Sequence, residues 1–162
     1  MTSPISNTGP SASDRSKRGE TVFNLQTARS MLPLVRHIIH DILHTRQELA
    51  RQQPEQRQLD RQRHTLDWPA RSRRYQLRDE ISAKERHLQE AQAELENLGV
   101  VLLDPAKGQV GFPTLVNGRR AFFSWRPSDE ALRHWHFVGE KVRRLIPAAW
   151  NLEPQGSVPG QS

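Results

Sequence analysis

The stretch "QVGFPTLVNGRRAFFSWR", residues 109–126, decides the fold of this chain. Asn117 and Gly118 stand between two apolar runs, and an Asn-Gly pair in this setting is the strongest short-range signal for a two-residue β-hairpin. A turn centred there pairs Phe112 with Phe123. Alternate residues of each strand then form one mostly apolar side, which we expect to face the core.

The opposite side of the same hairpin is mixed, with Pro113 opposite Phe122 and Gln109 opposite Arg126. In this register Gly111 lies opposite Ser124, so we expect space beside the Ser124 hydroxyl. Just upstream, "VVLL" at residues 100–103 is typical of a short buried strand, and "DPAKG" at residues 104–108 has the composition of a tight turn. The sequence therefore predicts a small antiparallel β-sheet.

Two long helical patterns precede the sheet. Apolar residues recur in steps of three and four through residues 25–49 and again through residues 77–98, where Gly99 provides a stop. We expect helices at 24–52 and 69–98, bent at Pro33 and joined by a polar connection. They should form an antiparallel hairpin like a coiled coil. The predicted structural core, from both helices and the sheet, is Leu32, Val35, Ile39, Ile42, Ile81, Leu88, Leu95, Phe112, Phe123, Trp125 and Trp135.

After the β-hairpin, Ser128 can cap a short helix, "DEALRHWH", at residues 129–136. On such a helix Asp129 and His136 share a face, and we expect Asp129 to form a local ion pair with His136 or Arg133. The predicted fold class is α+β, mainly α. It consists of a long antiparallel helical hairpin with a small antiparallel β-sheet and a short C-terminal helix.

The domain organisation follows from composition. Residues 1–21 and 153–162 are rich in Ser, Pro and Gly, which predicts disordered tails. Residues 22–150 are expected to form a single domain, with the helical hairpin at 24–98 and the β-hairpin plus short helix at 99–147.

Charge and composition limit the classes of function. The net charge is +6, with 20 Arg and 4 Lys, and residues 51–78 carry eight Arg against Glu55, Asp60 and Asp67. We interpret 51–78 as a solvated loop that binds nucleic acid only weakly. The absence of cysteine excludes disulfides and thiolate metal sites within this sequence. No long apolar run predicts a membrane segment, so we expect a cytoplasmic protein.

The candidate catalytic residues are Ser124, Arg126, Asp129 and His136, with Asp129 and His136 also weak candidates for metal ligands. In a strand, His134 and His136 would share a face and could bind zinc, whereas the predicted helix separates them. A further set, His37, His40 and His44, lies opposite the apolar side of the first helix, where a solvated face is the better interpretation. No cofactor is predicted.

Three stretches resemble a bacterial family without assigned activity, domain of unknown function 2203. They are "FNLQTARSMLPLVR", "LGVVLLDPAKGQVGFP" and "FFSWRPSDEALRHWH", and the resemblance extends over about residues 22–147. The family pattern has Asp at the position of Gly111, Cys at Ser124 and Glu at Ala131, and a Glu-Glu pair where this chain has Gln26-Thr27. Asp129, Trp135 and His136 match it. The resemblance implies either a structural site or lost chemistry in this member.

Two classes of function remain open. The first is a non-catalytic helical scaffold or protein-interaction module, expected to be a homodimer or to bind a protein partner. The second is a metal-dependent or acid–base enzyme with a partly lost site at Ser124, Asp129 and His136, and weak nucleic-acid binding ranks third. Because few titratable groups remain, we favour the scaffold. We expect Trp125→Ala and Trp135→Ala to be destabilising, and Ser124→Ala and Asp129→Ala to have little effect.

Overall fold

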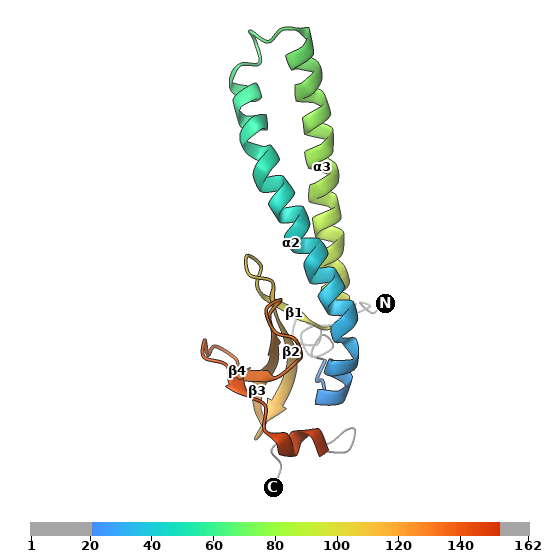
Figure 1. Ribbon diagram of the computed structural model, residues 1–162, viewed down its shortest axis with the longest axis vertical. Helices are drawn as coiled ribbons and strands as arrows, with labels where there is room; N and C mark the ends of the chain where they lie inside the picture. The colour runs from blue at the N-terminus through green and yellow to red at the C-terminus, as the bar shows by residue number, and fades with distance from the viewer. Residues whose placement is uncertain (1–20, 153–162) are drawn as a thin grey trace, which may run out of the picture.

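The computed structural model describes residues 21–152. Helix α2 (Leu25–Arg61) and helix α3 (Trp68–Asn97) run antiparallel and form a long arm, with an antiparallel sheet packed against the end away from their connecting turn (Figure 1). The strands are β1 (Val101–Asp104), β2 (Gln109–Val116), β3 (Arg119–Trp125), β4 (His134–Phe137) and β5 (Arg144–Leu145), and a 3-10 turn, η1 (Ala148–Leu152), follows. The predicted fold class is confirmed. The expected tails lie outside the described residues, apart from Thr21.

Side-chain caps fix where the helices begin. Asn24 accepts a hydrogen bond from the Thr27 amide at 2.7 Å, and Asp67 accepts one from the Ala70 amide at 3.0 Å. Helix α3 ends before Gly99, whose φ of +83° suits glycine. No helix between residues 21 and 152 combines the length and apolar character that crossing a membrane requires.

The expectation of a loop at 51–78 is wrong, because only residues 62–67 connect the helices. Helix α2 continues through the exposed Pro54, which removes one backbone donor without ending the helix. Two ion pairs between the helices support this part of the arm: Arg73 to Glu55 at 2.9 Å and Arg74 to Asp60 at 2.8 Å. Leu59 also packs against a small cluster formed by Leu49, Leu77 and Ile81.

The predicted register of the β-hairpin is confirmed. Phe112 pairs with Phe123, Gly111 with Ser124, and Asn117 has a positive φ of 52° in the turn between the strands. The space expected beside Ser124 is filled, however. A Cβ atom on Gly111 would lie 2.6 Å from the Phe122 ring and 2.9 Å from Leu103, so glycine lets these side chains cross the strand closely.

The prediction of a short helix at residues 129–136 is wrong, because the second half of this segment forms β4. Phe123 pairs with Trp135 and Ser124 with His134, so β3 supplies the backbone partners that a helix would have formed locally. Strand alternation also directs Trp135 toward Trp150 of η1, with ring centroids 5.3 Å apart. The Ser128 cap signal is therefore overridden by pairing with β3.

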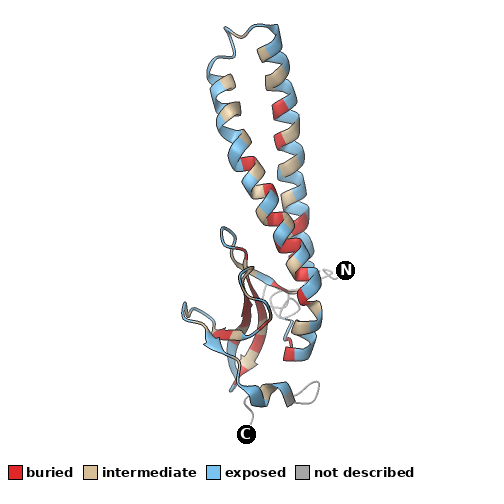
Figure 2. Cartoon of the chain, in the orientation of Figure 1, coloured by how far each residue is buried: buried red, intermediate tan, exposed pale blue. Residues whose placement is uncertain are grey.

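The main core lies where the first half of α2 and the second half of α3 meet one face of the sheet, and Figure 2 shows buried residues concentrated there. The residues predicted for the core are buried except Leu88, which is half-buried. Farther along the arm, burial is confined mainly to Leu49, Leu77 and Ile81. The base is thus well packed, whereas the distal arm has a thin core.

Candidate functional site

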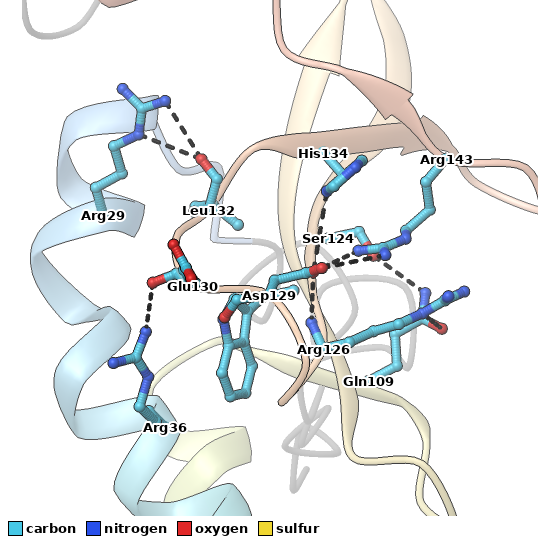
Figure 3. Close-up of polar contacts among 11 residues, drawn as sticks. Arg29, Arg36, Gln109, Ser124, Arg126, Asp129, Glu130, Leu132, His134 and Arg143 are labelled. Atoms are coloured by element: carbon cyan, nitrogen blue, oxygen red, sulfur yellow. Dashed lines mark hydrogen bonds and ion pairs between the residues drawn. The ribbon is translucent and has the colours of Figure 1, made fainter.

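A cluster of polar side chains lies at one end of the sheet, on the face turned away from the core (Figure 3). Its members come from β2, β3, β4 and the segments that follow β3 and precede β5. They are Gln109, Ser124, Arg126, Asp129, His134 and Arg143. The structure thus brings together three of the predicted residues and adds Gln109, His134 and Arg143.

Asp129 is the centre of this cluster. Its Oδ2 accepts a hydrogen bond from the Arg126 amide at 3.0 Å and one from Arg143 at 2.6 Å, while its Oδ1 lies 3.4 Å from the second Arg143 nitrogen. The prediction that Asp129 pairs with His136 or Arg133 is wrong, because its partner is Arg143. Burial acts to raise the pKa of Asp129, but the Arg143 and Arg126 bonds outweigh it, and the pKa lies below its usual value.

His134 lies beside this ion pair. Its Nδ1 is 3.9 Å from the Asp129 carboxylate, too far for a hydrogen bond, and has no hydrogen-bond partner among the described residues. Burial lowers the pKa of His134, and the Arg143 charge lowers it further, against the opposing effect of Asp129. Folding therefore shifts the His134 imidazole toward its neutral form.

Ser124 is fully buried, and its hydroxyl accepts a hydrogen bond from the Gln109 amide at 3.0 Å. Arg126 in turn donates to the Gln109 carbonyl oxygen at 3.2 Å. A nucleophilic serine needs an accessible hydroxyl bonded to a general base. Here the hydroxyl is enclosed and bonded to an amide, so the arrangement is that of a structural network.

His136 does not join the cluster. It pairs across the strands with Phe122, two positions beyond the Ser124–His134 pair. Its Nδ1 must donate to the Phe137 carbonyl at 2.8 Å, and its buried Nε2 has no hydrogen-bond partner among the described residues. His136 and Asp129 therefore form no shared metal or acid–base site.

No group of three potential metal ligands converges within residues 21–152. His37, His40 and His44 are exposed along α2, and His44 lies 3.2 Å from Glu48 one turn later. A pair on α2 and α3, His87 with Asp41 at 2.7 Å, is also exposed. These imidazoles have the environment of a solvated helix face.

Helix α2 holds the segment that carries Asp129. Arg36 donates to the Glu130 carbonyl at 2.8 Å, and Arg29 approaches the Leu132 carbonyl at 3.3 Å (Figure 3). The Trp125 indole donates to the Asp129 carbonyl at 3.1 Å from within the core. The segment after β3 is therefore fixed from both sides, and the Asp129 carboxylate has little freedom to reorient.

The described residues thus form a helical hairpin on a five-stranded sheet, with an internally bonded polar cluster. A family model described as "Uncharacterized conserved protein (DUF2203)" matches residues 21–144. The chain belongs to this family, as its sequence motifs predicted. No curated protein and no solved structure matches the chain.

The lowered pKa of His134 predicts a pH dependence of stability. Because the unfolded chain binds the proton more readily, the free energy of unfolding should decrease as pH falls below about 6.5, the ordinary histidine pKa. The lowered pKa of Asp129 should likewise decrease the free energy of unfolding below about pH 4. The free energy of unfolding, measured with urea at several pH values between these two, should depend less on pH in His134→Gln than in the parent. An identical pH dependence in both proteins would contradict the assignment.

Proposed function

We propose that this protein is a non-catalytic helical scaffold, in which the sheet forms a rigid base and the distal arm, residues 51–78, binds a partner. The observation that carries the proposal is the uncovered surface of the arm. Its Trp68 and Tyr75 side chains are 75% and 59% exposed, whereas every other aromatic side chain in residues 21–150 is buried or half-buried. Exposed aromatic side chains of this size are characteristic of binding surfaces.

The polar cluster supports a structural role for the base. Asp129 is bonded to Arg143 and to the Arg126 amide, and Ser124 is bonded to Gln109. A catalytic site needs a group that can exchange protons or electrons with a substrate. In this cluster Arg143 holds the Asp129 carboxylate, Gln109 holds the Ser124 hydroxyl, and the His134 Nδ1 is buried without a hydrogen bond to either group, so a metal-dependent or acid–base enzyme is the weaker interpretation.

The partner we propose for the scaffold is a second copy of the chain or another protein, in a cytoplasmic setting. The arm buries little of its own surface, since its distal core consists of Leu49, Leu77 and Ile81. Sedimentation at tens of micromolar concentration, where weak homodimers assemble, distinguishes between these two kinds of partner. A dimer indicates self-association, and a monomer directs the search to another protein.

Site-specific photo-crosslinking tests the proposed surface in cells. A photoreactive phenylalanine at Tyr75 should give a discrete adduct of higher mass, because Tyr75 lies on the exposed arm. The matched control is the same residue at Val142, which is 77% exposed on the base. An adduct from position 142 alone, or from neither position, would refute the scaffold with a binding arm.

A further inference from the structure

The aromatic residues of the distal arm lie on one face of α3 together with two arginines. Trp68, Arg71, Tyr75 and Arg78 follow one another in steps of three, four and three, a spacing that places all of them on one side of a helix. We refer to these four residues as the α3 stripe. Leu77 and the ion-paired Arg73 lie on the other side of α3, toward α2. The stripe therefore faces away from α2.

The two arginine side chains of the α3 stripe have no partner among the described residues. Arg71 and Arg78 are exposed, and neither guanidinium group forms a hydrogen bond or ion pair within residues 21–152. Of the acids on this part of the arm, Asp67 caps the start of α3 by accepting from the Ala70 amide, and Glu55 and Asp60 are paired with Arg73 and Arg74. Asp79 follows Arg78 and ends the cationic run. Two uncompensated guanidinium groups thus alternate with two exposed rings.

Alternating arginines and aromatic rings suit a ligand that has both negative charges and flat rings. Arginines attract phosphates, and aromatic side chains stack on bases with little regard to sequence. Trp68 and Tyr75 are seven residues apart, about 10 Å along the helix axis, which spans two to three nucleotides at a stacking distance of about 3.4 Å. Duplexes enclose their bases, so stacking of this kind requires an unpaired strand.

Other occupants suit the stripe less well. A second copy of the same face would bring like charges together, which opposes self-association there. Peptides that bind through apolar side chains need a groove to remove those side chains from water. The stripe lies on a convex helix face, whereas the hollow found on the arm is lined by Arg57, Asp60, Arg61, Arg63 and His64 at the end of α2 and in the turn.

We infer that the α3 stripe binds single-stranded nucleic acid, with Trp68 and Tyr75 stacking on bases and Arg71 and Arg78 contacting phosphates. The inference rests on the proposed function in one respect, that the arm is the binding part. The helical conformation of residues 68–78 aligns these four residues on one face. Binding of this kind is independent of sequence and sensitive to salt.

The stacking is tested by fluorescence anisotropy with a labelled oligouridylate. Its length of about 12 nucleotides is within the usual range of single-strand sites. Trp68→Ala and Tyr75→Ala should each weaken binding by about tenfold, the loss expected for one stacked base. Trp68→Phe keeps an aromatic ring and should stay within about threefold of the parent. Both rings are exposed, so the fold should remain intact, which circular dichroism verifies.

The salt dependence of binding tests the phosphate contacts. Replacing Arg71 and Arg78 together by glutamine should make the slope of log affinity against log salt shallower by about 1.4, or 0.7 for each phosphate contact. The matched control, Lys107→Gln with Lys141→Gln, removes the same charge from exposed positions on the base. That control should leave the slope nearly unchanged.

Three results from the variants and the duplex would overturn the inference. They are equal losses in the arginine and lysine double variants, equal affinity for a duplex of the same length, and unaltered binding after removal of both rings. A parent protein that fails to bind the oligouridylate also rejects it. If position 75 then crosslinks to a protein in cells, the arm remains a partner-binding surface and only the nucleic-acid assignment fails. A crosslinked adduct that nuclease shortens supports the assignment.

Discussion

Trp125→Ala is expected to lower the free energy of unfolding by about 3–5 kcal/mol, the usual cost of truncating a buried tryptophan. Trp125 is fully buried at the end of β3, and its indole donates to the Asp129 carbonyl. The Arg36 guanidinium lies 5.7 Å from the centre of the ring. Truncation would leave a cavity and an unpaired carbonyl, so both packing and hydrogen bonding are lost.

The chain provides a matched control for this substitution. Trp68→Ala removes the same side chain from a site that is 75% exposed, and should change stability by no more than about 0.5 kcal/mol. Urea unfolding followed by circular dichroism gives both values without depending on tryptophan emission. Similar losses in the two variants would mean that Trp125 does not hold the core together.

Asp129→Ala is expected to cost about 2–3 kcal/mol, since it leaves the Arg143 guanidinium and the Arg126 amide without their acceptor in a partly buried site. The Asp129 and Arg143 side chains are each only 12% exposed. This replaces the sequence-based expectation of a small effect, which assumed an exposed ion pair on a helix. The free energy of unfolding at neutral pH, measured in urea, checks it.

Two comparisons isolate the ion pair. Glu55→Ala breaks an exposed pair, with Glu55 and Arg73 43% and 40% exposed, and should cost under about 1 kcal/mol. A double-mutant cycle of Asp129→Ala with Arg143→Ala should give less than the sum of the single losses. Additive losses would show that Asp129 stabilises the protein through Arg126 alone.

Local patterns predicted much of the fold. The Asn117-Gly118 turn fixed the pairing of Phe112 with Phe123, because a two-residue turn and strand alternation leave one register. The helices were predicted from apolar spacing, since the same residues that pack in the core create the pattern. The first helix was predicted to end at residue 52, but α2 continues through the exposed Pro54, because a proline can remain inside a helix that its neighbours hold together.

The candidate site was predicted only in part, because its contacts join residues distant in sequence. The strand conformation of His134 depends on pairing with Ser124, ten positions earlier, whereas the local cap signal at Ser128 favoured a helix. Alternation of His134 and His136 around Trp135 was the available signal for a strand. The bond from Arg143 to Asp129 arises from the return of the chain after β4, and no spacing rule predicted it.

The strand order β1-β2-β3-β4-β5 is also the order along the chain, and α2 is followed directly by its packing partner α3. Each new element can therefore add to the one before it with little loss of chain entropy in closing loops. Proteins with such local connections fold quickly for their size. The long-range step is the docking of the start of α2 on the sheet, where the Thr114 hydroxyl bonds to the Phe23 carbonyl 91 positions away. We therefore expect the helical hairpin and the sheet to form separately and early, and their association through Phe23 to limit the rate of folding.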